Sequence, residues 1–167
     1  EVLAKAIAIS PSHVAIAGRH MGALSPPDGG TLGSAGHSVF FSVVERDGLR
    51  SETRAFGATT MGSSAHDIDL DDDHVCVSGN ATDASFEELQ LVGDAVAGRA
   101  GFVICDELVD TVAEPKVRMF DDRVGGLQLD GASLVVGVSV PGEPGMFTFE
   151  PASLAVLKAA WTHWTAR

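Results

Sequence analysis

The sequence has 167 residues, enough for one domain with a substantial core, and its 45% hydrophobic and 20% charged residues exclude an intrinsically disordered chain. The formal net charge of −12 argues against nucleic acid as a partner, because phosphate binding requires a basic surface. No apolar run has the length of a membrane-spanning helix. The chain begins at Glu1 with no signal-peptide pattern, so we interpret it as a processed chain or as part of a longer one.

The first unit, residues 2–61, predicts four short strands, at residues 5–9, 13–17, 38–45 and 51–59. Pro11 marks the first turn, and Asp47-Gly48 marks the last one. Residues 18–37 are rich in glycine, proline and serine, which is typical of a long surface loop.

The second unit, residues 62–122, begins with two strands around an acidic turn, within residues 67–79. Ser85 and Glu88 form a capping box, and Leu89, Val92 and Val96 share a face at helical spacing. This pattern predicts a helix over residues 86–97. Strands at residues 102–107 and 116–121 complete the unit.

The third unit, residues 123–167, predicts strands at residues 126–129, 134–140 and 146–150 and a last strand near residues 160–165. Residues 151–160 could instead form a helical turn. His13, His74 and Ser133 occupy the same place in the three units, about 61 and 59 residues apart. Many strands carry apolar residues on both faces, one set large and one small, as in a sheet packed between two others. Four-stranded sheets stacked in this way are the blades of a β-propeller.

The three units resemble the repeats of bacterial-type β-propellers called SBBP repeats. Residues 67–71 and 74–79 follow the first half of that repeat, and residues 38–48 follow its second half. The stretch around Trp161 and Trp164 is similar to the tryptophan-containing fourth strand. The resemblance implies an all-β propeller that acts as a binding module or scaffold, often in exported proteins. It carries over no catalytic residue.

Three units are fewer than the ~4 to 8 blades that close a propeller. We therefore expect a single partial propeller domain over residues 1–167, completed by a second copy, by another chain or by the rest of a larger protein. The alternative is a β-sandwich built from three units.

The densest acidic cluster suggests a Ca²⁺ loop, because hard cations take several carboxylate oxygens, but an ordinary acidic turn is the interpretation that we favour. Its members are Asp67, Asp69, Asp71, Asp72 and Asp73. His20 and His37 flank the first long loop, which also contains Asp28, and could meet at its base as a metal or acid–base pair. The histidines at positions 13 and 74 are first of all structural repeat positions.

The two cysteines are predicted to face each other. If Asn80 lies opposite Gly101 in an antiparallel pair, Cys76 lies opposite Cys105, either as a disulfide or as two reduced core residues. Asn80-Ala81-Thr82 is a possible N-glycosylation acceptor, which would need a secretory route.

We expect a non-enzymatic propeller module that binds a protein or glycan or serves as a structural subunit, without a cofactor. The alternative is a propeller enzyme with a loop-lined central site that could use Ca²⁺ or the pair His20 and His37. The insertions at residues 18–37 and 80–100 should lie on one side of the assembly, and any partner surface should lie there. An extracellular or otherwise exported location is expected.

Overall fold

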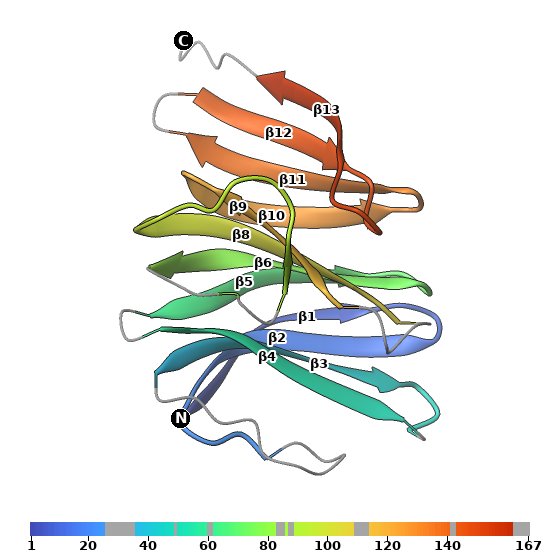
Figure 1. Cartoon of the computed structure of the whole chain (residues 1–167). Coiled ribbons are helices and arrows are strands. Elements are labelled where there is room, and N and C mark those ends of the chain that lie inside the picture. The colour runs from blue at the N-terminus through green and yellow to red at the C-terminus, as the bar shows by residue number, and fades with distance from the viewer. Residues whose placement is uncertain are drawn as a thin grey trace, which may run out of the picture.

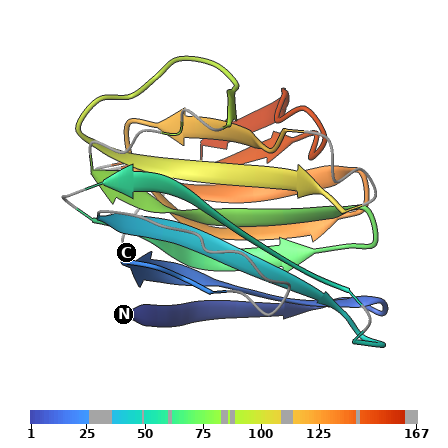
Figure 2. The same cartoon turned by 60° about the horizontal axis from the view of Figure 1, so that its bottom comes forward.

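The computed structural model describes residues 1–25, 36–48, 50–59, 62–82, 86, 89–108, 114–140 and 143–161. The fold is all-β, with three antiparallel sheets stacked face to face in the order of the sequence (Figure 1). The same stack is seen after a turn of the molecule (Figure 2). In the part of the chain that the structure describes, no helix has the length and apolar character that crossing a membrane requires.

Each sheet is a meander, because its antiparallel strands follow one another through short connections or insertions. The first sheet contains β1 (Val2–Ile9), β2 (His13–Met21), β3 (His37–Glu45) and β4 (Ser51–Thr59). The second contains β5 (Ser63–Leu70), β6 (His74–Thr82), β8 (Arg99–Glu107), β9 (Lys116–Phe120) and the two-residue β7 (Gln90–Leu91) at its edge. The third contains β10 (Arg123–Asp130), β11 (Ser133–Val140), β12 (Glu143–Phe149) and β13 (Val156–Trp161).

Two predicted elements differ from the structure. The helix expected over residues 86–97 is not formed in its described part: Gln90 and Leu91 are β7, which runs parallel to β9. The backbone N–H groups of Gln90 and Val92 donate to the carbonyl oxygens of Pro115 and Val117, so sheet pairing prevails over local helical spacing. The last strand begins at Val156, earlier than predicted, after a turn at residues 151–153; residues 162–167 lie outside the described residues.

The core consists of two separate seams between neighbouring sheets. The first seam joins sheets one and two and includes Ala15, Ala17, Phe41, Val77 and Phe102. The second seam joins sheets two and three; its buried members include the side chains of Cys76, Cys105, Leu134, Val136 and Phe149. Each fully buried large side chain contributes roughly 1.5–3 kcal/mol to the free energy of unfolding, so these seams hold the stack together.

Every sheet therefore has two different faces. We call the face toward the preceding sheet the leading face and the face toward the following sheet the trailing face. At the first seam, small side chains of the first sheet's trailing face, Ala8, Ala15 and Ala17, meet large ones of the second sheet's leading face, such as Ile68 and Leu70. The small apolar residues predicted on one face of a strand therefore pack against the large apolar residues predicted on the facing sheet.

The first strands of the sheets lie together, with β5 in contact with both β1 and β10, whereas the outer strand β4 barely touches the second sheet. This is the arrangement of blades around a propeller axis. Each first strand is bulged at a corresponding place, between Ala4 and Ala6 in β1 and between Ala65 and Asp67 in β5. A Cβ on Gly18 or Gly79 would lie 2.0 or 2.2 Å from a carbonyl oxygen of that strand, which explains the glycine that closes the repeated motif.

Candidate functional site

The acidic cluster connects neighbouring sheets. On β5, one carboxylate oxygen of Asp67 accepts the backbone N–H of Leu127 at 2.9 Å, and one of Asp69 accepts that of Leu129 at 2.8 Å. The other oxygen of each carboxylate accepts the N–H of the next residue in its own strand. Two aspartates thus satisfy the edge amides of β10, which has no strand beside it there.

The remaining acidic residues point elsewhere. One carboxylate oxygen of Asp71 accepts the N–H groups of Asp73 and His74 and so caps the turn between β5 and β6. Asp72 accepts the hydroxyl of Ser12, on the turn of the first sheet. The cluster therefore faces sheet three at one end and sheet one at the other. Among the described residues, no group of three or more His, Cys, Asp or Glu side chains is arranged to hold a metal ion.

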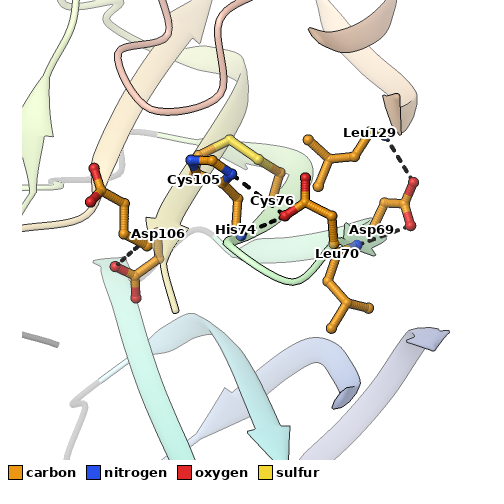
Figure 3. Close-up of a disulfide and its surroundings, with 9 residues drawn as sticks. Asp69, Leu70, His74, Cys76, Cys105, Asp106 and Leu129 are labelled. Atoms are coloured by element: carbon orange, nitrogen blue, oxygen red, sulfur yellow. Dashed lines mark hydrogen bonds and ion pairs between the residues drawn. A yellow bond between two sulfur atoms is a disulfide. The ribbon is translucent and has the colours of Figure 1, made fainter. Parts of the chain in front are cut away.

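Cys76 on β6 and Cys105 on β8 are directly opposed and joined by a disulfide, with 4.2 Å between their Cα atoms (Figure 3). The predicted register is confirmed, since Asn80 lies opposite Gly101. Both cysteines are buried in the second seam, where they pack against the third sheet. The disulfide therefore joins two neighbouring strands of the second sheet and lies on the trailing face of that sheet.

A buried carboxylate lies on the other face of the same hairpin. Asp106 is 4% exposed, and its Oδ2 lies 3.1 Å from Nε of Arg54 on β4, so the ion pair crosses the first seam. Burial raises the pKa of Asp106 to about 6, against the opposing effect of Arg54 and with a further raising effect from Glu52. The sequence does not indicate this contact, because Arg54 and Asp106 are far apart in the chain and lie in different sheets.

The histidines do not form the expected pair. His20 lies opposite Ser38 and Met21 lies opposite His37, so alternation along the strands places the two imidazoles on opposite faces of the sheet. The Nδ1 atom of His20 contacts the carbonyl oxygen of Gly22 at 3.0 Å, and burial lowers the pKa of this histidine. Asp28 lies outside the described residues.

The repeated histidines serve the turns. The Nδ1 atom of His13 lies 2.8 Å from the hydroxyl of Ser12, and that of His74 lies 3.5 Å from the carboxylate of Asp71. In the first sheet, Ser10 accepts the same two turn amides that Asp71 accepts in the second. These positions are therefore structural within the described residues.

Asn80 lies within β6, and its side-chain oxygen accepts the backbone N–H of Val124 on β10 at 3.3 Å. It is partly buried at the second seam. Glycan attachment requires an accessible side-chain nitrogen, usually on a surface loop, so this position argues against use of the acceptor.

Concave surface is found at the rim where β2 and β6 end and the long insertions begin. One concavity of about 410 Å³ is lined by Arg99, Ala100, Asp121, Asp122, Arg123 and Ser139. A second, of about 290 Å³, shares Asp121 and Asp122 and is bounded by Asp94 and Val96 of the insertion and by Phe147 of the third sheet. Both open at the second seam. The insertion was predictable from the sequence, but these residues were not, because they come together only when sheets two and three stack.

Lys5 and His66 are the bulge residues of β1 and β5. Partial burial lowers the pKa of His66 on β5, and the cations Lys5 on β1 and Arg123 on β10 lower it further. One cationic or titratable side chain from each of three neighbouring first strands is thus within electrostatic range, in a chain whose net charge is −12.

Stacked meanders of four or five strands, with their first strands together, define a propeller-like fold. Neither protein-family models nor curated protein sequences match the chain, so membership in the SBBP repeat family stays a prediction. Solved structures do match in fold. A mutant of the Synechocystis apocarotenoid oxygenase has a TM-score of 0.54 and 11% identity, over 96% of this chain and 39% of that chain. An ACO/RPE65 chimera has a TM-score of 0.52 and 11% identity, over 95% and 38%.

The chain thus spans under two fifths of the chain of that apocarotenoid oxygenase mutant. At this identity the likeness concerns the fold alone. Both comparisons support sheets arranged as propeller blades, in agreement with the all-β fold predicted from the repeats.

Proposed function

We propose that this chain is a three-blade β-propeller module that binds a protein or glycan ligand at the rim formed by its insertions and inter-sheet connections. The observation that carries the proposal is the pair of concavities at the second seam, which share Asp121 and Asp122. Arginine and aspartate side chains offer directed donors and acceptors for hydroxyl and carboxylate groups. Loops on a rigid scaffold are the usual position of binding residues.

The rim cations refine the ligand class. Arg99 and Arg123 line the larger concavity, and Lys5 and His66 lie near Arg123 on the neighbouring first strands. A guanidinium group of this lining can bind a ligand carboxylate, and Asp121 and Asp122 can accept hydrogen bonds from ligand hydroxyl groups, so a uronic-acid or sialic-acid glycan or an acidic peptide is the ligand class that we propose.

The experiment screens the protein against arrays of neutral and acidic oligosaccharides and of peptides, and measures the affinity of any hit by calorimetry. Arg99→Ala combined with Arg123→Ala should weaken binding at least tenfold. Arg46→Ala is the matched control, because Arg46 lines a concavity of about 390 Å³ at the turns of the opposite rim. A hit that loses affinity with the control and not with the double variant would contradict the proposal.

A second candidate is an enzyme built on the same fold. It is favoured by one observation, that the solved structures with this fold include an apocarotenoid oxygenase. Metal analysis of the purified protein, followed by an oxygen-consumption assay with an apocarotenoid, tests it. Stoichiometric metal and turnover would favour the enzyme over the binding module.

We further propose an exported location, supported by the disulfide between Cys76 and Cys105, because such bonds persist in oxidising compartments. Fractionation of the producing cell, with the protein detected under non-reducing conditions, tests this. A reduced protein in the cytoplasm would contradict it.

A further inference from the structure

The leading face of the first sheet is uncovered. Ile7 and Ile9 on β1 are 63% and 65% exposed, and Ile16 on β2 and Val44 on β3 are 36% and 37% exposed. The register joins them into one patch, since Ile7 lies opposite Ile16, and Ile9 reaches Val44 through Val14. Four large apolar side chains on adjacent strands of one face are more than scattered surface hydrophobics.

The other two sheets carry the same positions in buried form. Ile68 lies opposite Val77 as Ile7 lies opposite Ile16, and these two residues are 4% and 0% exposed. In the third sheet Leu127 lies opposite Val136, at 9% and 0%. In both cases a preceding sheet covers the residues. The leading face of the first sheet is therefore half of a seam that the molecule already forms twice.

The far end of the stack has the equivalent of the face that the next sheet covers, with Thr148 and Lys158 beside Val135 on it. The trailing face of the third sheet has Gln128 opposite Val135, and Met146 opposite Gly137. Met146 is 50% exposed. In the second sheet, the residues that correspond to Gln128 and Val135 are Asp69 and Cys76, which the third sheet covers.

We propose that a second copy of this chain covers the first sheet, with the third sheet of one copy packed on the first sheet of the other. This rests on the proposed propeller module and extends it by naming its partner and the two faces that meet. Two copies joined twice in this way close a ring of six blades, within the ~4 to 8 that propellers use. The ring also leaves no uncovered end, as closed two-fold assemblies require.

A polar contact gives this seam its register. The carboxylate of Asp69 accepts the N–H of Leu129 across the second seam. Gln128 holds the place of Asp69 in the third sheet, and Ile9 holds the place of Leu129 in the first. The side-chain oxygen of Gln128 in one copy therefore accepts the N–H of Ile9 in the other. The same seam is thus specified by apolar packing and by an edge-strand hydrogen bond.

The test measures the mass of the full chain in solution by light scattering and native mass spectrometry at micromolar concentration. The expected mass is twice the chain mass of 17.3 kDa. Ile7→Glu and Met146→Glu should each weaken self-association at least about 100-fold, because each places a carboxylate in an apolar seam. Gln128→Ala should weaken it roughly 30-fold, because the closed ring loses one neutral hydrogen bond at each of its two seams. Leu91→Glu is the control, since Leu91 is 40% exposed on β7, away from both faces.

Mixing the two glutamate variants distinguishes a head-to-tail seam from a symmetric one. A mixed dimer keeps one intact seam, between the unchanged third sheet of the Ile7→Glu chain and the unchanged first sheet of the Met146→Glu chain. Mixing should therefore restore dimers. A wild-type monomer, a dimer sensitive to Ile7→Glu alone, or no recovery on mixing would each overturn the inference. Ligand binding at the rim by a monomer would leave the proposed function intact while refuting the second copy.

Discussion

Replacement of Asp106 by asparagine should change the pH dependence of stability. The carboxyl group of Asp106 is 4% exposed, and its pKa is raised from 3.8 to about 6. Between these two pH values the folded state binds more protons at this group than the unfolded state does. The stability that it contributes is therefore fully present below pH 3.8 and is lost as the pH rises through 6. At 1.36 kcal/mol per pKa unit, the loss is about 3 kcal/mol.

The assay is urea unfolding of wild type and Asp106→Asn at pH 4 and pH 7, under non-reducing conditions. Asparagine keeps the shape of the side chain and does not titrate, so the difference in unfolding free energy between the two proteins isolates Asp106. The unfolding free energy of the variant minus that of wild type should therefore be about 2 kcal/mol higher at pH 7 than at pH 4, because part of the effect is already lost at pH 4. Such a change is large against the 5–15 kcal/mol that stabilises a typical domain.

A second variant tests the physical cause. Arg54→Met removes the guanidinium whose charge lowers the pKa of Asp106, so the pKa of Asp106 should rise above 6 and the loss of stability should extend to higher pH. If the difference between wild type and Asp106→Asn is the same at both pH values within about 0.5 kcal/mol, Asp106 does not titrate as argued. The buried ion pair across the first seam would then need another explanation.

Three further predictions concern the second sheet. Cys76→Ala combined with Cys105→Ala should lower the unfolding free energy by about 4 kcal/mol, from a sequence separation of 29 residues, and reduction of the wild type should give the same urea midpoint as the variant. Asp69→Ala should cost about 1–3 kcal/mol by leaving an edge amide of β10 unsatisfied, whereas Asp69→Asn keeps an acceptor; equal losses for both would contradict the argument. Gly79→Ala should cost about 2–3 kcal/mol in thermal unfolding, because its Cβ would lie 2.2 Å from a carbonyl oxygen, while Gly137→Ala, with its nearest atom at 3.7 Å, should be nearly neutral.

The strands and their pairing were predictable because the information is local. Alternating large and small apolar residues define both faces of a strand, and a tight turn such as that around Ser12 fixes how the next strand pairs. The opposition of Cys76 and Cys105 followed from one assumed pair, Asn80 and Gly101. The helix predicted over residues 86–97 is not formed in the described part of that range, because local helical spacing competes there with backbone hydrogen bonds to β9, which the sequence does not display.

The candidate site was less predictable because its residues meet across seams. The acidic run was visible in the sequence, but the amides that Asp67 and Asp69 bind lie on β10, in another unit. The concavities combine Arg99 of β8 with Arg123 of β10 and depend on how two sheets stack. If the pairing of β2 with β3 had been known, the alternation of side chains would have placed His20 and His37 on opposite faces of the sheet.

The disulfide between β6 and β8 has a consequence for cleavage of the chain. Residues 77–104, which include the whole insertion of the second sheet, lie between its two cysteines. Exposed insertions are where proteases cut first. A single cut within this segment would break the backbone and leave both fragments covalently linked, with β6 and β8 still paired. The nicked protein would migrate as one species without reductant and as two species with it. Because the disulfide holds β6 and β8 together, the loop between them could also change in sequence without loss of the sheet.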